Sequence, residues 1–87
     1  MSDRITIKFA KSEGALIRLI GLVERKGWEV QALTLGQSVQ DGAAEMQLSL
    51  APRDETRTVD VLCRHIEKMH DVTDVEITSA SRVLEQA

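Results

Sequence analysis

Residues 4–35 read RITIKFAKSEGALIRLIGLVERKGWEVQALTL, and their pattern predicts the secondary structure of the first half of the chain. At its start, apolar and polar residues alternate strictly, with the apolar positions at Ile5, Ile7 and Phe9. A period of two places alternate side chains on opposite faces of an extended chain. Residues 4–9 are therefore predicted to form a strand with one buried face.

Behind this strand the apolar period changes to that of a helix. Ser12 is a typical N-cap residue, and Gly27 is the residue type that most often ends a helix. Between them, apolar residues recur with the spacing of a broad helical stripe. The pattern predicts a helix over residues 13–26, followed at once by a second strand over residues 28–35.

The second half repeats this order. Residues 43–50 alternate again after the turn signal Asp41-Gly42, and two strands joined by so short a segment indicate a hairpin. Pro52 is expected to end the third strand. A narrower apolar stripe predicts a second helix over residues 54–69, and residues 72–78 are the last predicted strand.

The resulting β-α-β-β-α-β order predicts an α+β, ferredoxin-like sandwich, because right-handed crossovers fold two such halves into one compact sheet. The expected sheet is four-stranded and antiparallel, with the first and third strands central and both helices on one face. Residues 1–78 are predicted to form this single domain. The polar segment 79–87 is expected to be a flexible tail.

The second predicted strand is apolar on both faces. In simple alternation Trp28, Val30 and Ala32 face one way, whereas Leu33 and Leu35 face the other. Such a strand is either covered on both sides or twisted by a bulge.

An edge strand of this kind is protected when a second copy pairs with it. We therefore expect a homodimer through the second strand, with Leu33 and Leu35 in the contact. Ile17 and Gly21 fall outside the apolar arc of the first helix and are two further candidates for contact with another chain.

Composition excludes several classes of function. The net charge is −3 and no Lys/Arg cluster forms, so no footprint for nucleic acid is present. Trp28 and Phe9 are the only aromatic residues, too few to stack single-stranded bases. No apolar run approaches a membrane span and the N-terminus lacks a signal-peptide pattern, so a cytoplasmic protein is expected. The lone Cys63 fits a reducing compartment.

Catalytic and metal-binding sets are not evident. Cys63 and His65 are two positions apart and so point to different sides of the predicted helix, which disfavours a nucleophile–base pair. His70 beside Asp71 lacks the further ligands of a metal site. We expect neither catalytic residues nor a metal or other cofactor in this chain. An enzyme of ferredoxin-like fold, such as an acyl phosphatase, is the disfavoured alternative.

The first loop, residues 11–14, is the strongest candidate for ligand binding. It ends a strand and opens a helix, where backbone N–H groups favour a carboxylate. Gly14 permits close approach of a ligand or of another backbone. The alternative is a capped turn that requires only a small residue at this position.

The run from Gly14 to Trp28 resembles the opening of an ACT domain and, more narrowly, that of acetolactate synthase (acetohydroxyacid synthase) small subunits. That family reads Gly-Ala-Leu-Ser-Arg-Val, then a Gly-Leu-Phe segment, then Arg-Arg/Lys-Gly-Tyr-Asn-Ile-Glu-Ser-Leu. This chain has Gly14-Ala15-Leu16-Ile17-Arg18-Leu19, Gly21-Leu22-Val23 and Arg25-Lys26-Gly27-Trp28-Glu29-Val30-Gln31-Ala32-Leu33. The segment from His70 to Val75 is also similar to the family's Val-Asp-Val-x-x-Val. The resemblance covers residues 4–78, and the chain length matches the short, isozyme II type of small subunit.

The resemblance implies a non-catalytic regulatory subunit of branched-chain amino-acid synthesis. Its partner would be the large subunit, which in that family holds thiamine diphosphate, magnesium and FAD. The small subunit raises the large subunit's activity and, in many members, makes it sensitive to valine. The family's effector site lies where the first loop meets the second strand of a paired domain. Carried over, the effector-binding residues are Lys11, Gly14, Ala15, Glu29 and Val30.

Two positions depart from the family pattern. Lys11 and Glu29 stand where the family usually has Asn, so full charges replace neutral amides. They can pair with each other, bind the carboxylate and ammonium of an amino acid, or fill the site. Activation of a catalytic subunit is therefore favoured over feedback inhibition. The alternative function is a free-standing ACT-domain amino-acid sensor that acts on another protein.

Overall fold

The computed structural model describes residues 3–37 and 43–79, and these form the predicted β-α-β-β-α-β order. Its elements are β1 (Asp3–Ala10), α1 (Ala15–Arg25), β2 (Trp28–Gln37), β3 (Ala43–Pro52), α2 (Val59–Glu67) and β4 (Val72–Ser79). The Asp41-Gly42 turn and the tail from residue 80 onward lie outside the described residues.

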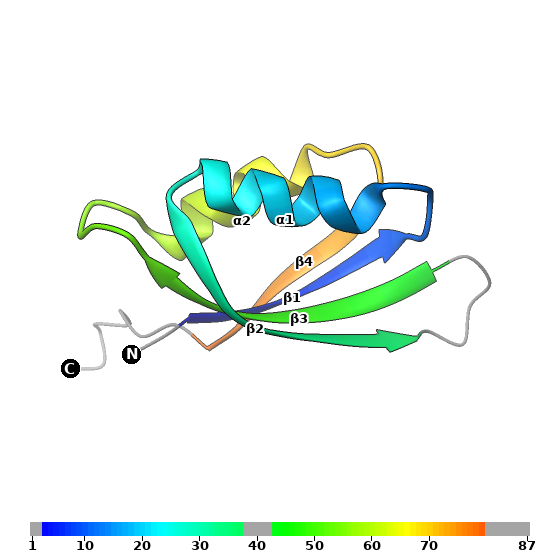
Figure 1. Cartoon of the computed structure of the whole chain (residues 1–87), viewed down its shortest axis with the longest axis horizontal. Helices are drawn as coiled ribbons and strands as arrows, with labels where there is room; N and C mark the ends of the chain where they lie inside the picture. Colours follow the sequence, from blue (N-terminus) through cyan, green and yellow to red (C-terminus); the bar gives the residue numbers. More distant parts are fainter. Residues whose placement is uncertain (1–2, 38–42, 80–87) are drawn as a thin grey trace.

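The sheet has the strand order β2-β3-β1-β4, and its three strand pairs are antiparallel. β1 and β3 are therefore central and β2 and β4 are the edges, as the sequence predicts. Figure 1 shows α1 and α2 side by side on one face of the twisted sheet. The fold is a two-layer ferredoxin-like α+β sandwich.

Cross-strand rows of apolar side chains form the sheet side of the core. Ile5 lies opposite Leu48, and Ile7 lies opposite Met46. These four side chains are fully or almost fully buried, and the helices cover them with Leu19, Val23, Leu62 and Ile66. Burial of one such side chain stabilises the folded state by about 1.5–3 kcal/mol, so the alternating apolar residues of β1 and β3 contribute strongly to the packing of the sheet against the helices.

The predicted alternation in β2, which puts Leu33 and Leu35 on the face opposite Trp28, is wrong. The register of β2 against β3 shifts between Val30 and Ala32, which marks a bulge at Gln31. After the bulge Leu33 lies opposite Leu48 and Leu35 lies opposite Met46. Directly opposed residues of antiparallel strands share a face, so both leucines join Trp28 on the helix side of the sheet.

The predicted N-cap of α1 is also wrong. Gly14, with φ +79°, precedes the helix in a left-handed conformation, and Ala15 is its first residue. The Ser12 hydroxyl instead donates a hydrogen bond to Asp71 Oδ1 at 2.9 Å. The local cap signal was overridden by a partner 59 residues away.

The second helix begins five residues later than its apolar stripe predicts, at Val59 rather than residue 54. Pro52 is the last residue of β3, and a turn follows it. There the Asp54 carboxylate accepts hydrogen bonds from the backbone N–H of Thr56 at 2.9 Å and from its hydroxyl at 2.5 Å. Asp and Thr commonly form such local bonds in competition with helix, which explains the late start.

Candidate functional site

The first loop is a tight turn between β1 and α1. The Ser12 N–H donates to the Ala10 carbonyl at 2.9 Å, and the Ala15 N–H donates to the Ser12 carbonyl at 3.0 Å. The positive φ of Gly14 closes the turn, a conformation that residues with a Cβ rarely adopt. Backbone hydrogen bonds and the left-handed Gly14 thus shape this turn.

Asp71, at the end of the α2–β4 connection, fastens this loop to the rest of the domain. Its carboxylate accepts a hydrogen bond from Arg18 Nη2 at 2.5 Å as well as the one from Ser12. Its carbonyl accepts the Ala10 N–H at 2.8 Å. The hydrogen bond from Arg18 is the main cause of the lowered pKa of Asp71, and the one from Ser12 is the next. Both oxygens of the Asp71 carboxylate thus have partners within the fold, which disfavours a metal site made of His70 and Asp71.

A cavity of about 300 Å³ opens between the first loop, the start of α1 and the far end of β2. Apolar side chains form most of its wall, namely Phe9, Leu16, Leu35 and Ala44. Lys11, Ser12, Glu13 and Gly36 complete the lining. The cavity therefore combines an apolar floor with one positive and one negative side chain, a combination that suits an amino acid with an apolar side chain.

The structure places only part of the predicted effector site at this cavity. Lys11 lines it, and Gly14 lies in the same loop. Ala15 is almost fully buried in the core. Glu29 and Val30 lie opposite Ala51 and Leu50, at the other end of β2.

Glu29 and Gly36 are seven positions apart on β2, which corresponds to about 23 Å at a strand rise of roughly 3.3 Å per residue. Within one chain, Lys11 and Glu29 therefore do not meet. Sequence reasoning missed Phe9, Leu16 and Leu35 as lining residues. For Leu35 the available signal was that β2 is apolar on both faces. We interpreted this as a contact with a second copy, whereas the bulge turns the Leu35 side chain to the helix side of the sheet.

The four candidates for contact with a second copy are placed differently from one another. Ile17 is 77% exposed, the highest value among the large apolar residues described, and Gly21 lies one turn along on α1. Leu33 and Leu35 are 41% and 50% exposed at the edge strand. All four are thus accessible, on two separate elements.

No catalytic set emerges from the described residues. Cys63 is buried in α2, and burial raises the pKa of its thiol to about 11. Among the described residues, no group of three or more His, Cys, Asp or Glu side chains could hold a metal ion. None of the described helices is long and apolar enough to cross a membrane.

The fold defines a small domain of the ferredoxin-like type, with a tight loop between β1 and α1. A family model described as "ACT domain" matches residues 11–75, about three quarters of the chain. The chain belongs to the ACT domain family. Comparison with curated proteins found no match.

Solved structures of other ACT proteins superpose on this chain. The acetolactate synthase small subunit from Thermotoga maritima gives a TM-score of 0.76 at 17% identity over 88% of this chain and 47% of that subunit, so this chain spans about half its length. The ACT domain of GTP pyrophosphokinase from Chlorobium tepidum gives 0.70 at 17% identity, over 88% of this chain and 96% of that domain. An ACT domain protein from Streptococcus pneumoniae gives 0.62 at 17% identity, over 90% and 89%. Likeness at these identities shows the fold.

Proposed function

We propose that this chain is a regulatory subunit that binds the large subunit of an acetolactate synthase and raises its activity. The observation that carries the proposal is the run from Gly14 to Leu33, whose order and spacing resemble those of acetolactate synthase small subunits. In the structure this run forms the end of the first loop, α1 and the bulged part of β2. The thiamine diphosphate, magnesium and FAD of the reaction would all reside in the large subunit.

The cavity at the first loop is the proposed effector site. A branched apolar side chain such as that of valine would pack on Phe9, Leu16 and Leu35. The Lys11 ammonium would bind the effector's carboxylate, since charge-assisted hydrogen bonds are the strong ones. Glu13 lines the same cavity and is the nearest carboxylate in the loop for the effector's ammonium.

A homodimer through β2 would complete this site. β2 is an edge strand, so one row of its backbone groups is open to pairing with another strand. If two copies pair antiparallel with Leu33 opposite Leu33, and the bulged Gln31 of each copy stays unpaired, Glu29 of the second copy falls opposite Gly36, beside the cavity. In this register Glu29 of one copy lies at the cavity that Lys11 of the other copy lines, so the two predicted partners can interact across the interface. The proposed dimer therefore has two equivalent effector sites.

The first experiment measures acetolactate formation by the purified cognate large subunit with and without this chain, each with and without valine. A higher rate with the chain present supports the regulatory subunit, and a valine-dependent fall in that rate supports the effector site. An unchanged rate together with no complex in gel filtration overturns the proposal.

A free-standing amino-acid sensor is the second candidate. It is supported by the structural likeness to an ACT domain protein from Streptococcus pneumoniae, of which this chain covers 89%. Calorimetry of the isolated chain with valine, leucine and isoleucine distinguishes the two. Binding of an amino acid without any effect on the synthase favours the sensor.

A further inference from the structure

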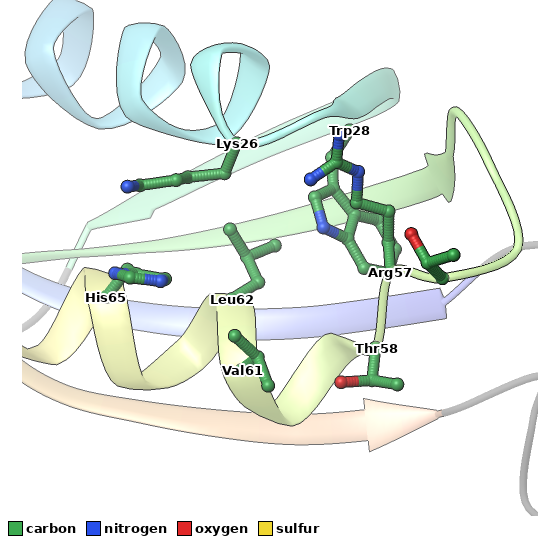
Figure 2. Close-up of a pocket in the computed structure, with 8 residues that line it drawn as sticks. Lys26, Trp28, Arg57, Thr58, Val61, Leu62 and His65 are labelled. Atoms are coloured by element: carbon green, nitrogen blue, oxygen red, sulfur yellow. The ribbon is translucent and has the colours of Figure 1, made fainter.

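A second cavity, of about 130 Å³, lies at the opposite end of α1 from the first loop. It is enclosed by the end of α1, the start of β2, the β3–α2 connection and one face of α2 (Figure 2). Among the described residues that line it, three are basic and none is acidic: Lys26, Arg57 and His65. The hydroxyl-bearing Thr56 and Thr58 are also in the lining. Basic and hydroxyl-bearing side chains of this kind are groups that donate hydrogen bonds to anions.

Gly27 leaves room for the Arg57 guanidinium at one wall of the cavity. A Cβ at Gly27 would lie 2.3 Å from Arg57 Nε, so only glycine leaves room for the guanidinium there. The Gly27 carbonyl also accepts the Arg53 N–H at 2.9 Å, which ties the β3–α2 connection to the end of α1. Asp54 lies on the other side of Arg57, with Oδ2 3.4 Å from Nε. The guanidinium thus occupies the space beside Gly27 and pairs with a carboxylate outside the lining.

Lys26 and His65 form the opposite wall. Figure 2 shows the Lys26 side chain extending from the end of α1 toward His65 on α2. The charged groups around the imidazole are Lys26 from α1, Lys68 from the end of α2, and Arg57 across the cavity. Partial burial lowers the pKa of His65, and the charges of Lys26 and Lys68 lower it further.

We propose that this cavity binds a small oxyanion, a phosphate or carboxylate group, between Lys26, Arg57 and His65. Two cationic side chains and an imidazole from three segments line this one cavity, and each can donate a hydrogen bond to an oxyanion bound there. The volume admits one such group and excludes the bulk of a larger ligand. This site is separate from the effector cavity and does not depend on the proposed role in an acetolactate synthase.

The test is an NMR titration of the histidine side chains of the full chain with inorganic phosphate, and separately with acetate, at constant ionic strength set by chloride. A bound anion stabilises the imidazolium, so we expect a saturable shift of the His65 signals and a higher pKa for His65. His70 is exposed near the other end of the domain, and it serves as the internal control. Saturation with phosphate alone, with acetate alone or with both identifies the oxyanion class that the site prefers.

Matched variants separate a site from general screening. Lys26→Met and Arg57→Gln are each expected to raise the Kd for phosphate, measured from the His65 signals, about tenfold. This is the effect of losing one charge-assisted hydrogen bond. Arg64→Gln is the control, because Arg64 lies on α2 outside the cavity and pairs with Asp60 at 3.7 Å. Circular dichroism checks that each variant folds. If Arg57→Gln does not fold, the test rests on Lys26→Met. Equal, non-saturable shifts of His65 and His70, or equal losses in Lys26→Met and Arg64→Gln, overturn the proposal.

Discussion

Arg18 in α1 and Asp71 before β4 form an ion pair between Nη2 and Oδ2 at 2.5 Å, although 53 residues separate them in the chain. Arg18 Nη1 also donates to the Glu13 carbonyl at 3.2 Å. One arginine therefore joins the first loop to the α2–β4 connection. The pair links the two halves of the domain at the place where the proposed effector binds.

The first prediction concerns this link. Asp71→Asn removes the ion pair and weakens the hydrogen bond from Ser12, so the first loop becomes less ordered. We expect faster amide hydrogen exchange at Ser12 and Ala15 and a lower affinity for the amino-acid effector. The matched control is Asp74→Asn, because Asp74 is exposed on β4. Equal exchange rates in the two variants would show that Asp71 does not order the loop.

The second prediction is a pH dependence of stability. The pKa of Asp71 is lowered in the folded chain, chiefly by Arg18 and then by Ser12, whereas an unfolded Asp titrates near about 3.9. The stabilisation is therefore present above the unfolded pKa and is lost as the pH falls through the folded pKa. Urea unfolding of the wild type and Asp71→Asn at several pH values checks this. The difference between their free energies of unfolding should be largest near neutral pH and should shrink in acid.

The third prediction contrasts two glycines. Gly27 has φ +89°, so Gly27→Ala forces a left-handed conformation on alanine and should lower the free energy of unfolding by about 1–2 kcal/mol. Gly21 lies inside α1, and a Cβ there meets nothing closer than Arg25 Nη1 at 3.8 Å. Gly21→Ala should therefore raise the free energy of unfolding by about 0.5–1 kcal/mol. Urea denaturation of the two variants measures both signs, and a stabilising Gly27→Ala would contradict the assigned conformation.

How far the sequence predicts this structure depends on how local each signal is. Strict alternation around Ile7 and Met46 depends only on the period of two and the buried face of a sheet, and it predicts the two central strands correctly. The position of Ser12 was misread because its hydroxyl bonds Asp71, a partner brought close only by the complete fold. A local pattern contains no information about such a partner.

The candidate site was predictable in part for the same reason. Lys11 and Gly14 lie in a loop whose ends are marked in the sequence, and they were found. Leu35 was assigned to the wrong face, because the single bulge at Gln31 reverses every side chain that follows it. A bulge in a strand with apolar residues on both faces leaves no mark that distinguishes it from a strand covered on both sides.

The fourth prediction concerns Cys63. Its pKa is raised to about 11, first by burial and then by the charges of Glu67 and Asp60, so about one thiol in a thousand is ionised at pH 8. We expect alkylation by iodoacetamide at pH 8 to be slow in the folded chain and fast in urea. A labelling rate in the folded chain equal to that of the urea-unfolded chain would show that the thiol is exposed.

The fifth prediction tests the effector site and the dimer register together. Glu29 lies far from Lys11 within one chain, so any interaction between them must join two copies. Lys11→Glu places two acids on opposite sides of the proposed interface, and Glu29→Lys places two bases there. Each variant should weaken dimerisation and the response to valine by about tenfold, whereas the double variant restores the opposite pairing and should recover dimerisation.

Sedimentation equilibrium measures the dimer, and the valine dependence of acetolactate formation measures the response. Arg25→Glu is the control for a charge reversal elsewhere, because Arg25 is exposed at the end of α1. Recovery of the dimer without recovery of the valine response would mean that Lys11 contacts the effector itself, since its ammonium is then absent from the cavity. Additive losses in the double variant would rule out the register that places Leu33 opposite Leu33, because in that register Lys11 and Glu29 are proposed partners.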